Sequence, residues 1–161
     1  METRLSRWGV GPRIIGSALL YAAAAVSATY RWPEYCIVPL LRSDVVTAIA
    51  VIMLAAGVAM WAVSAVTVMQ AYNRDQLVTG RTFALVRHPV YSAAIVLMVP
   101  ACALLTRSWP LLLTPVVAYT VFKLLIHRED EYLEQRYGQS YRDYRARVNE
   151  LFPIPRFHAR R

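Results

Sequence analysis

The chain has 161 residues, 57% of them hydrophobic, and a formal net charge of +8 that comes from 17 arginines and one lysine against ten acids. This composition excludes an ordinary soluble domain of the same size and predicts one all-α integral membrane domain over residues 1–161. A net positive charge is typical of proteins that bind nucleic acid or anionic lipid, and of the cytoplasmic flanks of membrane helices. Because the arginines fall at the ends of the apolar runs, we favour the flanks and expect no nucleic-acid partner.

The first two apolar runs predict the first two membrane helices. Residues 14–30 are about long enough to cross a bilayer. Interfacial aromatic residues follow this run and no cleavage site stands out, so we expect a retained helix rather than a signal peptide. Residues 45–72 form a longer run in which only Gly57 is a weak helix breaker, which indicates a tilted second helix.

The next two apolar runs predict a helical hairpin. Residues 90–106 and 110–126 are separated by a very short turn around residues 107–108, so these two helices must be antiparallel neighbours. Pro100 and Pro115 are expected to kink them. We interpret these prolines as adjustments of helix shape rather than as catalytic features.

The residues after the last apolar run predict a helical tail outside the membrane. A helix that leaves the bilayer is expected to end near Gly138, which suits a helix C-terminus. Ser140 then begins a short second helix with a capping-box-like pattern, and this helix has Tyr141, Tyr144 and Val148 on one side.

The arginine distribution predicts the orientation of the helices. Arginines gather before residue 14, in residues 73–89 and in the tail that includes residues 127–152, whereas the two opposite loops are nearly neutral. Short cytoplasmic loops collect lysine and arginine, so we expect a multi-pass protein with both termini in the cytoplasm. The arginine-rich, lysine-poor usage suggests a bacterial protein of the inner membrane.

A first polar block, residues 79–92, lies between two apolar runs and includes Arg87, His88 and Pro89. Pro89 suits the first position of a membrane helix, where its missing N–H costs nothing. The following N–H groups and the helix dipole can receive a carboxylate or phosphate, and the two basic side chains add positive charge. From the residues alone, an interfacial histidine that caps the helix is the leading alternative for His88.

A second block contains four acids just after the fourth apolar run. Helical geometry places Glu129 on the apolar stripe of that helix, where a carboxylate is costly unless it is paired or functional. Glu129 is therefore the acid that we expect in a site, and an ion pair with Arg128 or Arg136 is the structural alternative. The other three acids, which we expect on a solvated face, are Asp130, Glu131 and Glu134.

The two blocks together resemble the isoprenylcysteine carboxyl methyltransferase family and its phospholipid N-methyltransferase relatives, over roughly the C-terminal half of the chain. The residues concerned are Gly80…Arg87-His88-Pro89-x-Tyr91 and Glu129-Asp130-x-x-Leu133-x-x-x-Tyr137-Gly138-x-x-Tyr141-x-x-Tyr144. The resemblance implies a membrane methyltransferase that uses S-adenosylmethionine and acts on a lipophilic small molecule or a lipid. The sequence shows no metal-ligand pattern and no G-x-G-x-x-G motif, which excludes a methyltransferase of the soluble type.

The resemblance also implies a set of site residues. The carboxylate of S-adenosylmethionine would meet His88 and the N–H groups after Pro89, and its ammonium would meet Glu129. The residues expected to take part in catalysis are Arg87, His88, Glu129 and Arg128. The residues expected to bind the cofactor are Gly80, Leu85, Val86, His88, Pro89, Tyr91, Glu129 and Tyr137. Packing or interfacial roles are the alternatives for the two tyrosines.

The chain departs from the family pattern at three places. Gly80-Arg81-Thr82 replaces the usual Gly-Pro-Tyr, Ser92-Ala93 stands where a glycine usually follows, and Asp130 replaces a second glutamate. The first two departures are expected to alter loop shape and cofactor packing.

The acceptor and the alternatives stay open at this point. The N-terminal half shows no recognisable motif, so a carboxylate, a phenol or enol, a thiol and a lipid amine all remain candidate acceptors. An NADPH-dependent reductase of the sterol-reductase type and a non-catalytic membrane subunit are the competing functions. Cys36 and Cys102 are expected to be structural thiols, although a disulfide is open, and the sequence does not decide whether the protein forms a homo-oligomer.

Overall fold

The computed structural model describes residues 10–39, 43–74 and 76–154, and these residues form helices joined by turns, without a strand. In chain order the elements are α1 (Gly11–Arg31), α2 (Pro33–Cys36), α3 (Asp44–Arg74), η2 (Arg81–Ala84), α4 (Pro89–Ser92), η3 (Ala93–Met98), α5 (Val99–Thr106), α6 (Trp109–Leu112), α7 (Thr114–Tyr137) and α8 (Gln139–Arg147).

Four helical stretches are long and apolar enough to cross a membrane. They are Gly11–Arg31, Asp44–Ala71, Pro89–Thr106 and Trp109–Tyr137. Many large apolar side chains on these stretches are exposed, as Leu20 (77%) and Ile52 (68%) illustrate. Lipid rather than water suits such surfaces, and the predicted all-α membrane fold with four spanning helices is confirmed.

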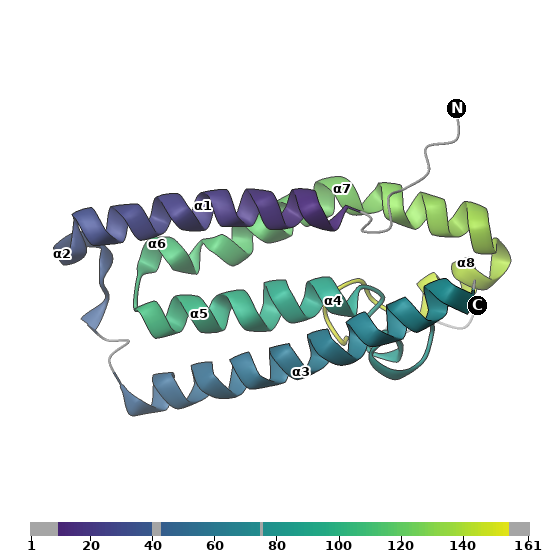
Figure 1. Cartoon of the computed structure of the whole chain (residues 1–161), viewed down its shortest axis with the longest axis horizontal. Coiled ribbons are helices and arrows are strands. Elements are labelled where there is room, and N and C mark those ends of the chain that lie inside the picture. The colour runs from purple at the N-terminus through teal and green to yellow at the C-terminus, as the bar shows by residue number, and fades with distance from the viewer. Residues whose placement is uncertain (1–9, 40–42, 75, 155–161) are drawn as a thin grey trace, which may run out of the picture.

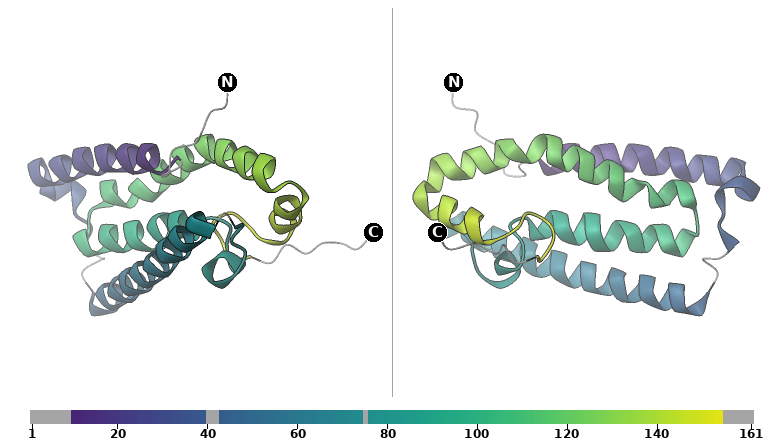
Figure 2. Two further views of the ribbon diagram at one scale, coloured as in Figure 1. Left: turned by 45° about the vertical axis from the view of Figure 1, so that its right-hand side comes forward. Right: turned by 180° about the vertical axis from the view of Figure 1, so that it is seen from behind.

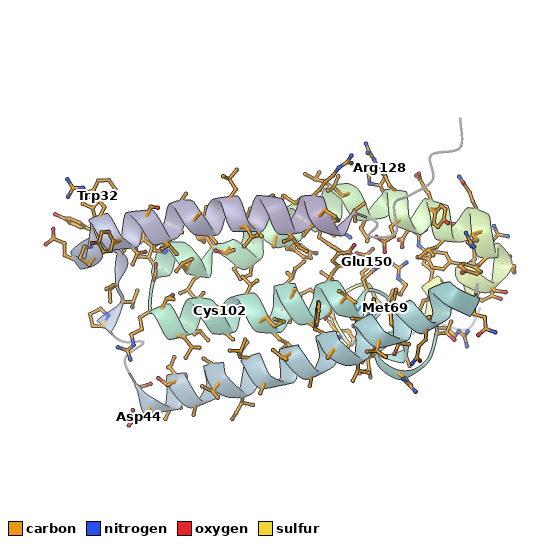
Figure 3. The ribbon with its side chains drawn as sticks, viewed as in Figure 1. Trp32, Asp44, Met69, Cys102, Arg128 and Glu150 are labelled. Atoms are coloured by element: carbon orange, nitrogen blue, oxygen red, sulfur yellow. The ribbon has the colours of Figure 1, made fainter. Side chains whose placement is uncertain are left out.

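The four spans alternate in direction. Figure 1 shows α1 beside α7, and α3 beside the helix formed by α4, η3 and α5. The segment between α3 and α4 and the residues after α7 therefore reach the same end of the molecule, as the view from behind in Figure 2 also shows. Trp32 and Asp44 mark the opposite end (Figure 3). This alternation is what brings the two polar blocks together.

The third span is irregular before its proline. Ala93–Met98 (η3) is a π-helix, so the helix widens just upstream of Pro100, at which a kink was predicted. Gly57 of α3 packs against this segment: a Cβ there would lie 2.6 Å from Met98 Cγ and 3.0 Å from Leu97 Cβ. The glycine expected to act as a weak breaker instead permits two membrane helices to approach closely.

The fourth span begins with a separate short helix. Leu113 separates α6 from α7, so the helix predicted over residues 110–126 is divided near its start, and α7 extends to Tyr137. Pro110 and Pro115 both lie in the first turn of their helices, where a missing N–H breaks no helical hydrogen bond. Pro115 therefore lies in the first turn of α7, just after the break at Leu113, and not inside a continuous helix as predicted.

The turn of the hairpin packs against the loop after α1. The backbone N–H of Val38 donates to the carbonyl of Arg107 (2.9 Å), and the Trp109 indole donates to the carbonyl of Tyr35 (2.9 Å). Cys36 is buried and Cys102 is exposed, and both are free thiols.

The helical tail folds back on α7. Gly138 has φ +54°, a left-handed value that glycine adopts without strain, and it joins α7 to α8. The predicted face of α8 is confirmed, because Tyr141 and Tyr144 are buried and pack with Phe83, and Val148 packs against them. The first polar block and the tail thus share one apolar cluster.

Candidate functional site

Arg87 and His88 are buried just before α4, with 3% and 5% of their surfaces exposed. Their backbone N–H groups donate to the carbonyls of Asn149 (2.7 Å) and Glu150 (3.0 Å), in the segment that follows α8. That segment therefore determines how the chain enters α4 at Pro89.

The guanidinium of Arg87 lies between two carboxylates. Its Nη1 is 3.1 Å from Asp130 Oδ2 and its Nη2 is 3.2 Å from Glu150 Oε1. Nη1 also lies 3.4 Å from the hydroxyl of Tyr141. A buried charge is tolerated when it is paired and hydrogen-bonded in this way. Both amino groups of Arg87 are thus engaged by protein groups.

Asp130 is buried at the centre of this cluster, with 3% of its surface exposed. It accepts hydrogen bonds from Arg87, from the Tyr141 hydroxyl and from His88 Nε2 at 3.2 Å. The expectation that Asp130 belongs to a solvated face is therefore wrong. It failed because it treated that side of α7 as free, whereas α8 folds back and covers it.

Glu129, the preceding residue, faces a different set of groups. Its Oε2 accepts a hydrogen bond from the Tyr91 hydroxyl (3.2 Å), and its Oε1 lies 3.7 Å from His88 Nδ1. The rings of His88 and Tyr91 both pack against Phe122, one apolar wall of this arrangement. The Glu129 side chain keeps 22% exposure, against 5% for Asp130, so Glu129 remains partly accessible and Asp130 does not.

The other predicted site residues lie in three kinds of surroundings. Val86 and Pro89 are buried next to Arg87 and His88, and Tyr91 contacts Glu129. Tyr137 packs against the apolar cluster of Phe83, Tyr141 and Tyr144. The structure leaves Gly80, Leu85 and Arg128 exposed, and Figure 3 shows Arg128 on the outer side of α7.

Besides Asp130, two residues of the cluster lie outside the sequence-based set. Tyr141 contacts Asp130 and Arg87, although the spacing of the tail tyrosines indicated packing alone. Glu150 contacts Arg87 from the far end of the tail, in a stretch without any motif. A lone acid 63 residues from its partner leaves no local pattern, so only the folded chain identifies it.

The tyrosines of α8 are held in their neutral form. Burial raises the pKa of the Tyr141 hydroxyl far above its ordinary value of 10.0, and the hydrogen bond to Asp130 adds to the rise. Burial likewise raises the pKa of Tyr144, whose hydroxyl donates to the carbonyl of Phe83 at 2.7 Å. Both side chains therefore remain hydrogen-bond donors at neutral pH.

A surface pocket of about 240 Å³ lies beside the cluster. Its walls include Tyr119, Lys123 and Phe152, and Glu150 is at its boundary. Lys123 Nζ is 2.6 Å from Glu150 Oε2, and the lysine side chain is 45% exposed. One carboxylate oxygen of Glu150 thus pairs with the buried Arg87, and the other pairs with the half-exposed Lys123.

Comparison with known proteins identifies the family. Residues 43–140, more than half of the chain, match the family model described as phospholipid methyltransferase. No curated protein and no solved structure gives a significant match. The matched region contains the first polar block, the four acids of the second block and three of the four membrane spans. The chain therefore belongs to the phospholipid methyltransferase family and is a membrane methyltransferase.

Proposed function

We propose that this protein transfers a methyl group from S-adenosylmethionine to a small lipophilic acceptor at the cytoplasmic face of a bacterial inner membrane. The acceptor is a carboxylate, a phenol or enol, a thiol or a lipid amine. The observation that supports this proposal is the partly exposed Glu129 carboxylate, which lies beside His88 and Tyr91 at the start of a membrane helix.

The groups around Glu129 fit the amino-acid end of S-adenosylmethionine. The carboxylate of Glu129 suits the ammonium of the cofactor. The first-turn N–H groups of Val90 and Tyr91 cannot be reached by carbonyls of their own helix, so they suit its carboxylate. His88 adds a donor there only when its Nδ1 carries a proton, because its Nε2 is bonded to Asp130. When bound, the cofactor supplies a sulfonium methyl group, which passes to the acceptor while the sulfonium becomes a thioether.

The chain's own residues hold this arrangement in place. Tyr91 donates to Glu129 and so orients the carboxylate. Asp130 accepts from His88 Nε2 and so orients the ring. Arg87 positions Asp130 and does not contact the acceptor, because its side chain is 1% exposed and both its amino groups are bonded. Methyl transfer depends on such orientation and on a dry site.

His88 is the group that can take a proton from an acceptor. The carboxylate of Asp130 only accepts hydrogen bonds, so in the neutral ring the proton is on Nε2. Nδ1, which faces Glu129, is then the basic atom. A thiol or amine acceptor needs this base, whereas a carboxylate or phenolate does not. Arg128 has no part in the proposed site, because it lies on the outer side of α7.

The arginines support the cytoplasmic placement of this site. Both polar blocks and α8 lie at one end of the spans, and the described arginine-rich segments, residues 76–89 and 127–152, belong to that end (Figure 1). Cytoplasmic loops are the ones that collect arginine. S-adenosylmethionine would then reach the site from the cytoplasm, and a lipophilic acceptor would reach it through the membrane.

A binding experiment tests the proposal. Calorimetry on the detergent-purified protein measures the affinity for S-adenosylmethionine, S-adenosylhomocysteine and NADPH in the wild type, in Glu129→Gln and in the matched control Glu131→Gln, which alters an exposed acid of the same helix. We expect both adenosyl compounds to bind, about tenfold more weakly to Glu129→Gln, and with unchanged affinity to the control. Binding of NADPH alone, or equal effects of the two substitutions, would contradict the proposal.

A further inference from the structure

The segment after α8 contacts the start of α4 through three backbone carbonyls. The N–H groups of Arg87 and His88 donate to the carbonyls of residues 149 and 150, and Ser92 Oγ donates to the carbonyl of Leu151 at 2.6 Å. We call residues 149–151 the strap. These bonds set one register between the strap and the first polar block.

The strap is anchored in the protein core. Leu151 is 2% exposed. It packs with Phe122 of α7 and with Val10 and Ile14 at the start of α1. Burial of this leucine side chain stabilises its position, so the strap is a bound part of the fold. Its register directs Glu150 inward, and Figure 3 shows Glu150 between α7 and α4.

Glu150 is the second of the two carboxylates that hold Arg87. Asp130 takes Nη1 and Glu150 takes Nη2, so the guanidinium is held from two sides. Asp130 is then left with one oxygen for Arg87 and the other, Oδ1, for His88 at 3.2 Å and for the Tyr141 hydroxyl. Without the charge of Glu150, the guanidinium would draw both oxygens of Asp130 into a bidentate pair. His88 would lose the acceptor that orients its ring.

We propose that Glu150 is a positioning residue of the methyltransferase site, which acts through Arg87 and Asp130 on His88. The strap, which lies beyond the region that matches the family, then completes the site from outside it. The inference rests on the proposed function only for its effect on cofactor binding. Its effect on the His88 ring is independent of any ligand.

The experiment compares Glu150→Gln with Lys123→Met in the full-length protein. The first substitution removes the charge that faces Arg87, and the second removes only the other partner of Glu150. Two quantities are measured: the dissociation constant of S-adenosylmethionine, and the nitrogen chemical shifts of the His88 ring without ligand, assigned with a His88→Gln variant. Thermal unfolding confirms that each variant is folded.

We expect Glu150→Gln to weaken cofactor binding about tenfold and to shift the His88 ring signals, and Lys123→Met to stay within about twofold of the wild type with unchanged signals. Unchanged His88 signals in a folded Glu150→Gln protein would overturn the inference, and so would equal effects of the two substitutions. A wild-type protein that does not bind S-adenosylmethionine would refute the proposed function, and the ring signals would still decide the role of Glu150.

A second variant covers the case in which Glu150→Gln does not fold. Ser92→Ala removes the hydrogen bond that anchors the strap at Leu151 and leaves every charge in place. We expect it to shift the His88 signals in the same direction, by a smaller amount. A folded Ser92→Ala protein with the His88 signals of the wild type would overturn the inference.

Discussion

Glu129 and Asp130, neighbours in α7, face the two nitrogen atoms of one imidazole. Asp130 Oδ1 lies 3.2 Å from His88 Nε2, and Glu129 Oε1 lies 3.7 Å from His88 Nδ1. Asp130 is buried with Arg87, whereas Glu129 keeps part of its surface exposed. The two acids therefore have different surroundings: Asp130 is part of a buried ion-pair cluster, and the partly exposed Glu129 is the acid that we propose to bind the cofactor.

Asp130→Asn should destabilise the protein much more than a surface substitution does. Removal of one partner of a buried ion pair leaves the charge of Arg87 incompletely compensated, and such losses cost about 3–5 kcal/mol. The control is Glu134→Gln, which alters half-exposed ion pairs with Arg142 and Arg145 and should cost about 1 kcal/mol or less. Reversible unfolding in mixed micelles measures both, and similar losses would contradict the structural role of Asp130.

Gly57→Ala should lower stability, because the new methyl group meets atoms that cannot easily move. The added Cβ would lie 3.0 Å from Leu97 Cβ and 3.3 Å from the backbone nitrogen of Met98. Such overpacking costs about 1–3 kcal/mol. Gly16→Ala is the matched control in α1, where nothing lies within 4 Å of the added atom, and it should be neutral or stabilising. The melting temperatures of the two variants in detergent test this difference.

Arg107→Gly should stabilise the turn between α5 and α6. Arg107 has φ 58°, a left-handed conformation that costs about 1 kcal/mol for a residue with a side chain and little for glycine. Arg107→Ala removes the same guanidinium but keeps a Cβ, so it should show no gain. If both variants raise the melting temperature equally, loss of charge rather than relief of strain is the cause.

The stability of the protein should fall as the pH rises above 10. Tyr144 has a raised pKa in the folded protein because of burial, so above its ordinary pKa of 10.0 the unfolded chain binds fewer protons than the folded one. One such tyrosine contributes a loss of about 1.4 kcal/mol per pH unit. Tyr144→Phe should reduce the slope of unfolding free energy against pH between 10 and the pH of alkaline unfolding. Tyr30→Phe, which alters a 90% exposed side chain, should leave that slope unchanged.

The membrane helices could be predicted from the sequence because spanning is a local property. About twenty apolar residues form a span wherever they occur, and α1, α3 and the α4–α5 span begin and end within three residues of the predicted bounds. The break between α6 and α7 was not predicted: the sequence indicated one continuous helix over residues 110–126 with a kink at Pro115, because a proline in the first turn of a helix and a proline inside one differ only in where the helix begins.

By itself the sequence determined the four spans, the hairpin and the meeting of the two polar blocks, because span length, loop length and an even number of crossings are readable along the chain. It also indicated Glu129, since an acid on an apolar stripe is conspicuous. Only the tertiary structure decided that Asp130 is buried and that Glu150 holds Arg87. Both outcomes depend on α8 and the strap folding back over α7, and such long-range pairings leave no periodic pattern in the sequence.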